Sequence, residues 1–251
     1  MTQQNNIPSS TTPPPGVSFH YELPAKKPII TYILLTLTIL IYFLQFLSKQ
    51  FFQIDVLAIY GMKINELINE GQIWRLITSM FLHANIMHIG FNMYALYSFG
   101  RSLERFYGHS RFLFLYLLSG FAGNIVSYYF TDNPSLGAST AIFGLVAAEG
   151  VFIHINKKFF PNAQKALQQL IMIVIINFIL GLSPQIDNWG HLGGFVGGLA
   201  FAWFTGPLLD AKITETGIKL FDKHIGKIST ITIIVEFLIL AVLTAIRVIF
   251  N

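Results

Sequence analysis

A serine and a histidine stand at the heads of two long apolar runs, and together they could carry out acyl transfer. Ser139 lies in the small-residue stretch 137–144, and His191 lies in the stretch Gly190–Gly194. Imidazole is the usual base that takes the proton of a nucleophilic serine. A lone serine in an apolar run more often bonds to its own helix or to a neighbouring one. The histidine in the same setting is what makes Ser139 a candidate nucleophile.

The composition predicts that these runs lie in a membrane. Of the 251 residues, 53% are hydrophobic and 11% are charged, and the mean hydropathy is +0.59. A soluble domain carries about 25% charged residues. The net charge of +4 comes from Lys and Arg residues between the apolar runs, where they report membrane topology rather than nucleic-acid binding. Because the chain has no cysteine, disulfides, thiolate metal sites and a cysteine nucleophile are excluded.

Seven segments come close to the roughly 20 apolar residues that a helix needs to cross a bilayer. They are residues 28–48, 86–106, 112–130, 139–156, 166–182, 191–209 and 229–250. We therefore predict an all-α polytopic membrane protein, a helical bundle with a six-helix core in 28–209 and an additional C-terminal helix in 229–251. Residues 210–228 are expected to be a linker, and 1–27, which are rich in Gln, Asn, Ser, Thr and Pro, a flexible tail.

The distribution of the 16 Lys and Arg residues predicts the orientation of these helices. If the chain changes sides with each span, twelve fall on the side of the tail and linker and four on the other. The positive-inside rule then places the N-terminus, tail and linker in the cytoplasm and the C-terminus outside. We expect the bacterial cytoplasmic membrane. Ser139, His191 and His88 then lie at a similar depth, towards the external face.

Polar residues elsewhere in the apolar chain receive structural interpretations. The segment 49–85 is too apolar to be fully solvated, and we expect it to lie partly in the membrane interface with Trp74 and Arg75 as anchors. Glu236, in the last span, is expected to be paired inside the bundle; a functional role is the alternative.

Acyl transfer also needs hydrogen-bond donors for the developing oxyanion. Ser139 begins a predicted helix, so its own N–H is free and the positive end of the helix dipole lies behind it. His88 and Asn92 are four residues apart, so they share one helix face and could both point inward. These three groups are the candidate oxyanion hole.

A metal site is a competing interpretation of the histidines. His83, His88 and His191 could in principle bind one ion, but no carboxylate that would orient such ligands is visible near them. His83 lies five residues before His88 and need not share its helix face, so we interpret it as structural. We expect no metal and no other cofactor.

No carboxylate is placed to complete a catalytic triad. By the predicted topology, Asp187 lies in an external loop and the intramembrane glutamates lie towards the cytoplasmic ends of their helices. A Ser–His dyad is the better interpretation. Phe143, one turn after Ser139, could supply an aromatic face for His191.

Small residues at every fourth position could let the two helices approach closely. One helix carries Gly190, Gly194 and Gly198, and the other carries Thr140, Gly144 and Ala148. Plain packing is the alternative interpretation, because such patterns are common in membrane bundles.

Taken together, these motifs resemble those of the rhomboid intramembrane serine proteases over residues 28–209. In chain order they are Gln72-Ile73-Trp74-Arg75, His83 with His88-Ile89-Gly90-Phe91-Asn92, Gly100…Glu104…Gly108, Gly137-Ala138-Ser139 and Gly190-His191-Leu192-Gly193-Gly194. The resemblance implies that Ser139 is the nucleophile and His191 the general base and acid. It implies an oxyanion hole of His88, Asn92 and the Ser139 amide, a membrane-embedded first loop with Trp74 and Arg75, and a structural cytoplasmic network around Glu104. The last span matches the six-plus-one arrangement of one branch.

Two positions depart from the family pattern. Thr140 follows the nucleophile where the family usually has glycine, and its side chain could narrow the approach of water or substrate. Phe143 replaces a common tyrosine and keeps the ring but not the hydroxyl. Neither change removes a catalytic atom, so we expect slower or differently tuned activity at most.

The function predicted from the sequence is an intramembrane serine endopeptidase. Its partners would be transmembrane protein substrates and the lipid bilayer, and not nucleic acid; the sequence does not indicate an oligomeric state. The short fifth span and the loop 184–188 are candidate gates. The alternatives are a catalytically weak or inactive rhomboid-like protein that binds transmembrane helices, and a transporter or channel. The latter would show broken helices or inverted repeats near the midplane.

Overall fold

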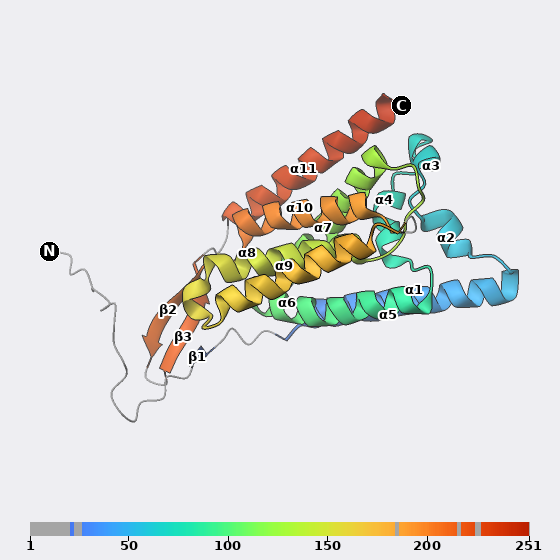
Figure 1. Ribbon diagram of the computed structural model, residues 1–251. Coiled ribbons are helices and arrows are strands. Elements are labelled where there is room, and N and C mark those ends of the chain that lie inside the picture. Colours follow the sequence, from blue (N-terminus) through green and yellow to red (C-terminus); the bar gives the residue numbers. More distant parts are fainter. Residues whose placement is uncertain (1–20, 23–26, 184–185, 215–216, 224–226, 251) are drawn as a thin grey trace.

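The computed structural model describes residues 21–22, 27–183, 186–214, 217–223 and 227–250. In this part of the chain, long helices lie side by side in a bundle and a small sheet lies at one end of it (Figure 1). The elements are β1 (Tyr21–Glu22), α1 (Ile29–Phe52), α2 (Val56–Gly61), α3 (Asn65–Asn69), α4 (Arg75–Thr78), the 3₁₀ turn η1 (Ser79–Phe81), α5 (Ile86–Ala95), the π-helix η2 (Leu96–Gly100), α6 (Arg101–Tyr107), α7 (His109–Phe130), α8 (Ser139–Ile155), the 3₁₀ turn η3 (Lys157–Phe159), α9 (Ala163–Leu180), α10 (Asn188–Thr205), β2 (Leu209–Thr214), β3 (Gly217–Asp222) and α11 (Lys227–Ile249).

Each of the seven predicted spans coincides with helix, and the ends differ by a few residues. Among the described residues, α1, α7, α9 and α11 are long and apolar enough to cross a bilayer, whereas α8 is apolar but shorter. The second predicted span consists of α5, η2 and α6, which follow one another without a break. The predicted all-α polytopic membrane fold is therefore confirmed.

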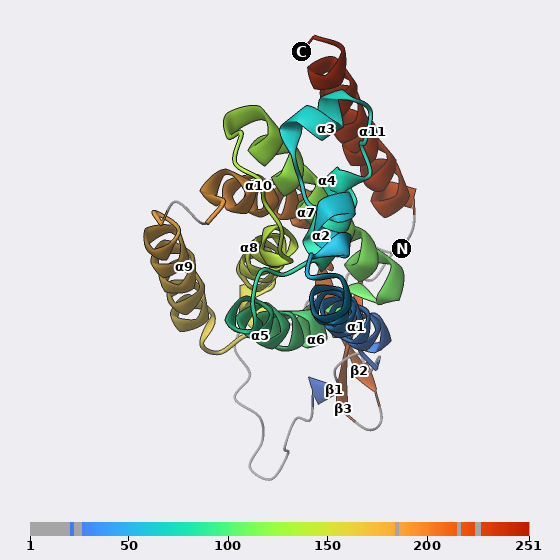
Figure 2. The same ribbon diagram turned by 90° about the vertical axis from the view of Figure 1, so that its right-hand side faces the viewer.

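Helix α8 lies in the centre of the bundle. Viewed along the helices, α7, α10, α9 and the rod formed by α5 and α6 lie around it (Figure 2). All residues of α8 from Thr140 to Ala148 are buried, whereas α9 buries none of its residues. A helix that is apolar all round belongs in an interior. The head of α8, where Ser139 lies, is therefore held by several elements, while α9 is held loosely.

Glycines allow α8 and α10 to touch through their backbones. A Cβ atom on Gly194 would lie 2.0 Å from the Thr140 carbonyl oxygen, and one on Gly198 would lie 2.3 Å from the Cα of Gly144. No larger residue fits these places unless the helices move apart. The stripe of small residues therefore makes the contact that its spacing predicted.

A buried carboxylate from α6 holds the start of α1. Glu104 accepts hydrogen bonds from the N–H groups of Ile30 and Thr31, at 2.8 Å each, and from the Thr31 hydroxyl at 2.6 Å. His109 Nδ1 lies 2.6 Å from the same carboxylate. The first N–H groups of a helix have no partner within it, and a negative charge suits this end of the helix dipole. Glu104 thereby ties α1 to α6 and α7.

Arg75 is buried within the protein, whereas a side chain that anchors the chain in the membrane interface would be exposed. Its side chain is 2% exposed. It donates hydrogen bonds of 2.8 Å to the side chain of Gln72 and to the carbonyls of Ile59 and Met62. A buried guanidinium is tolerated only where acceptors surround it. Arg75 therefore folds the segment between α1 and α5 upon itself, while Trp74 stays half exposed and donates to the Tyr60 carbonyl.

A buried lysine joins the same segment to the end of α7. Lys63 is fully buried, and its backbone pairs with that of Ser135. Its ammonium group donates to the carbonyls of Ser127, Thr131 and Asn133, at 3.4, 2.9 and 3.2 Å. Carbonyls at the C-terminal end of a helix carry partial negative charge, which attracts a cation. Burial lowers the pKa of Lys63 to about 8, although the charges of Asp187, Asp132 and Glu66 oppose the shift.

The segment expected to be a linker contains two strands, which the sequence analysis did not predict. β2 and β3 form an antiparallel hairpin, and β1 pairs in parallel with β3 to give the strand order β1-β3-β2. Of the tail predicted to be flexible, only residues 21–22 and 27 are described, and Tyr21 and Glu22 belong to this sheet. Arg111 binds Asp222 at 2.6 Å and so attaches the sheet to α7.

Helix α11 lies outside the six-helix core, against α7 and α10 (Figure 2). The guanidinium of Arg247 lies 5.5 and 5.4 Å from the rings of Tyr128 and Tyr129, and the Tyr129 hydroxyl donates to the Leu243 carbonyl at 2.7 Å. Glu236 Oε2 is buried and has no hydrogen-bond partner in the described part of the chain, and the pairing expected for Glu236 stays a prediction.

Candidate active site

Ser139 and His191 meet at the heads of α8 and α10. His191 Nε2 lies 2.9 Å from Ser139 Oγ, within hydrogen-bonding distance. Ser139 is the first residue of α8, and His191 lies in the first turn of α10. Because the glycines of α10 bring its axis against α8, these first turns are adjacent. The pair has the geometry that a serine nucleophile and its base require.

The imidazole of His191 is held by packing. Its ring stacks on that of Phe143, with centroids 4.3 Å apart and planes 17° apart, and the side chain is largely buried. Its Nδ1 has no hydrogen-bond partner among the described residues. Asp187 does not reach the ring: its Oδ1 caps α10 by accepting the Gly190 N–H at 2.8 Å, and its Oδ2 bonds the Ser127 hydroxyl. Among the described residues, no carboxylate therefore bonds to the His191 ring.

Gly137 shapes the turn that leads into the nucleophile. Its φ of +137° lies in the region that favours glycine. A Cβ atom here would lie 2.7 Å from both Cε1 and Nε2 of His88. The Gly137 N–H donates to the Ser79 carbonyl at 2.9 Å, which fixes the turn to η1. This close approach places the His88 ring beside the backbone that precedes Ser139.

Asn92 and His83 flank His88. Asn92 is 6% exposed, and one N–H of its amide donates to the His88 carbonyl at 2.8 Å. The rings of His83 and His88 meet edge to face with centroids 5.0 Å apart. The Ala138 N–H points to His83 Nε2 at 3.4 Å. Burial, and secondarily His88, lower the pKa of His83 to about 3, so its ring is neutral at pH 7 and can accept this bond.

The branched side chain of Thr140, beside the candidate nucleophile, is buried between helices. Thr140 is 4% exposed, and its side chain packs against Gly123 of α7 and Gly190 of α10. Its hydroxyl has no hydrogen-bond partner in the described part of the chain. Thr140 thus fills a gap between α8, α7 and α10, and through this packing it can affect the position of Ser139.

The histidines do not assemble a metal site. Among the residues that the structure describes, no group of three or more His, Cys, Asp or Glu side chains is arranged to hold an ion. The three-histidine alternative that the sequence left open therefore finds no support in the geometry.

The site and bundle agree with a family comparison. The family described as the Rhomboid domain matches residues 70–208, which is more than half of the chain. This range contains Ser139, His191, His88 and Asn92. The chain therefore belongs to the rhomboid family, and its apolar helices make it an integral, multi-pass membrane protein.

Similar proteins come from a bacterium and a plant. The chain is 42% identical over 173 residues to rhomboid protease GluP of Bacillus subtilis (strain 168), covering 68% of this chain and 34% of that protein. It is 36% identical over 153 residues to RHOMBOID-like protein 9, chloroplastic, of Arabidopsis thaliana, covering 60% of this chain and 35% of that protein. It is 33% identical over 180 residues to RHOMBOID-like protein 2 of the same plant, covering 70% and 57%. The matched segments thus span about a third to just over half of these relatives.

Several residues around the site escaped the sequence analysis. The Ser79 carbonyl accepts the Gly137 N–H in the turn before Ser139, and Lys63 donates to the Asn133 carbonyl a few residues earlier. Gln45 bonds the backbone of His83, which lies beside that turn. Gln45 had a usable signal, since it is an amide inside the first apolar span and such residues need partners. Ser79 acts through its carbonyl, which every residue type possesses.

Proposed function

We propose that this protein is an intramembrane serine endopeptidase, which cleaves peptide bonds in or near transmembrane segments. The observation that carries the proposal is the 2.9 Å contact between Ser139 Oγ and His191 Nε2 inside a membrane bundle. The family membership and the likeness to a bacterial rhomboid protease support it. No described carboxylate joins the pair, so His191 would act as the only base.

The reaction would proceed by acyl transfer. His191 Nε2 accepts the proton of Ser139 while Oγ attacks the substrate carbonyl. The oxyanion that forms is stabilised by the Ser139 N–H at the head of α8, with His88 and Asn92 as further donors. His191 then gives the proton to the leaving amine. Water, deprotonated by the same imidazole, releases the acyl group and restores the serine.

Helix α9 is the element best suited to admit a substrate helix. It buries none of its residues, and a groove of about 280 Å³ lies between it and α8 and α10. A loosely held helix can move with little loss of packing. The charge distribution supports an orientation with the N-terminus in the cytoplasm and Ser139 towards the outside. The host membrane in this proposal is the bacterial cytoplasmic membrane.

The decisive experiment compares Ser139→Ala with the parent in liposomes that contain a single-pass substrate. We expect cleavage to fall by at least about a thousandfold, because the nucleophile is lost. Ser98→Ala is the matched control, since Ser98 is exposed and bonds only to its own helix. If Ser139→Ala cleaves as fast as the parent, the assignment is wrong.

A small fluorophosphonate probe supplies the second arm of the test. It should label the parent at Ser139 and leave Ser139→Ala and His191→Ala unlabelled. Failure to label the parent in both detergent and lipid would favour a rhomboid-like protein that binds transmembrane helices without cleaving them.

A further inference from the structure

A glutamine is fully buried in the largely apolar helix α1. Gln45 is 0% exposed, although many apolar side chains of this helix face outward. A buried amide in a membrane span is costly unless its donors and acceptors are bonded. Both ends of this amide are bonded to one residue: Oε1 accepts the N–H of His83 at 3.0 Å, and Nε2 donates to the carbonyl of His83 at 3.3 Å.

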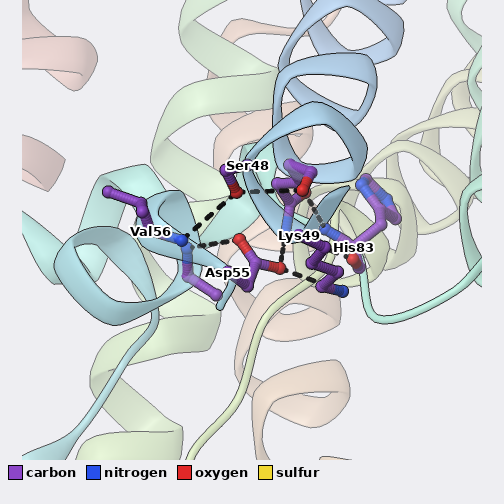
Figure 3. A network of polar contacts seen from close by, with 7 residues as sticks. Ser48, Lys49, Asp55, Val56 and His83 are labelled. Atoms are coloured by element: carbon purple, nitrogen blue, oxygen red, sulfur yellow. Dashed lines mark hydrogen bonds and ion pairs between the residues drawn. The ribbon is translucent and has the colours of Figure 1, made fainter. Parts of the chain in front are cut away.

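A second partner, Asp55, fixes the orientation of the Gln45 amide. Gln45 Nε2 also donates to Asp55 Oδ2 at 2.9 Å. Asp55 is itself fixed, because its other oxygen caps α2 by accepting the Ala58 N–H at 3.0 Å and Lys49 Nζ lies 3.1 Å away. Figure 3 shows this network: Asp55, at the start of α2, faces Lys49, near the end of α1, and His83 lies beside them. The orientation of the Gln45 amide is therefore determined.

His83, the residue that Gln45 bonds, itself contacts the candidate active site. His83 is fully buried, its Nε2 accepts the N–H of Ala138, and its ring lies against that of His88. Ala138 immediately precedes Ser139, and His88 is a candidate oxyanion donor. A displacement of the His83 backbone would therefore move two parts of the site at once.

We propose that Gln45 is a positioning residue of the active site, which clamps both backbone groups of His83 and thereby sets the places of Ala138 and His88. The expected effect of Gln45 on cleavage and labelling rests on the proposed proteolytic function. The hydrogen-bonded link between α1 and the turn before Ser139 does not depend on that function.

The first test replaces Gln45 by methionine, which has a similar length and no hydrogen-bonding amide. We expect kcat on a transmembrane substrate, and the labelling rate of Ser139 by a fluorophosphonate, to fall between about tenfold and a hundredfold, because small displacements of reacting groups cost this much. KM should not change, since the clamp does not touch the substrate helix. Both rates are measured well below the unfolding temperature of each variant.

Thr38→Val is the matched control. Thr38 is also fully buried on α1, but its hydroxyl has no partner in the described part of the chain. It should keep parental kcat and labelling. A merely structural role for Gln45 predicts a lower unfolding temperature with parental labelling rates, and that result would overturn the proposal.

A pair of variants tests the hydrogen bond between Gln45 and Asp55. Gln45→Glu places a carboxylate against Asp55 and should lower labelling strongly. Adding Asp55→Asn supplies an N–H donor to the new carboxylate, which still accepts the His83 N–H, so labelling should recover in part; the bond to the His83 carbonyl stays lost, because a carboxylate cannot donate. Lack of recovery in a double variant that folds like the parent would contradict the relay from Asp55 through Gln45.

Amide hydrogen exchange tests the Gln45 clamp without relying on catalytic activity. Amides in residues 82–92 and 136–142 should exchange faster in Gln45→Met than in the parent and Thr38→Val. If the parent neither cleaves nor reacts with the probe, the protease assignment fails, and this measurement still decides the clamp. Unchanged exchange in both segments overturns it.

Discussion

At Gly137, backbone conformation and side-chain space impose the same choice of residue. The φ of +137° disfavours any side chain, and a Cβ atom would lie 2.7 Å from the ring of His88. We expect Gly137→Ala to abolish cleavage and to destabilise the fold by about 1–3 kcal/mol, because the turn must change and His88 must move. Cleavage assays and thermal unfolding in detergent would measure the two effects.

Two other glycines serve as controls for this variant. Gly71 has a φ of +95°, but no atom lies within 4 Å of the place that its Cβ would take, so Gly71→Ala tests backbone strain without a clash. Gly90, within α5, also has open space, and Gly90→Ala should keep activity and leave stability equal or slightly higher. Parental activity in Gly137→Ala would show that the turn tolerates a side chain.

At the scale of elements, the contact between α8 and α10 brings Ser139 and His191 together. Gly198 lies about two helical turns after His191 on α10, and a Cβ there would meet the backbone of Gly144 at 2.3–2.6 Å. Gly198→Ala should therefore separate the helices, lower stability by about 1–3 kcal/mol and slow the proposed cleavage, although it replaces neither Ser139 nor His191. Thermal unfolding and kcat measure these changes.

Gly150→Ala on α8 is the control for Gly198→Ala, because Gly150 has room for a Cβ atom. The nearest atom to its Cβ would be Leu170 Cδ1 at 3.9 Å, an ordinary contact. This variant should behave like the parent. If both alanine variants kept the parental unfolding temperature and kcat, α8 and α10 would have to accommodate the extra methyl group without moving Ser139 away from His191.

At the scale of the whole molecule, Lys63 ties the segment after α1 to the end of α7, and its titration should appear in the stability. Its pKa in the folded protein is about 8, below the ordinary 10.5. Between these values the unfolded chain binds more protons, so stability should rise with pH from about 8 to about 10.5. The physical reason is that a neutral amine is less costly to bury than an ammonium group.

Lys63→Met isolates this contribution. The variant loses the hydrogen bonds to the α7 carbonyls at every pH, and it also loses the titration. The stability of the parent relative to the variant, measured by chemical unfolding at a series of pH values, should therefore increase from about pH 8 to about pH 10. A difference that stays constant or shrinks over this range would show that Lys63 is not titrating as its burial implies.

The positions of the helices and the meeting of Ser139 with His191 could be predicted from the sequence alone. A bilayer demands roughly 20 apolar residues per span, so the pattern of apolar runs marks the helices. Small residues recur every fourth position, so the pattern also marks which helix faces approach. Both signals are carried by residue type and local spacing.

Only the tertiary structure decided how the remaining polar groups are used. Arg75, Lys63 and Gln45 bond mainly to backbone carbonyls and N–H groups, which every residue presents, so residue types do not reveal their partners. β1 pairs with β3 across almost the whole chain, and the Thr140 side chain turns towards α7 and α10 because the glycines there leave room for it. Residue type and local spacing determined the spans and the two reacting side chains, whereas long-range backbone contacts decided the turn that presents them.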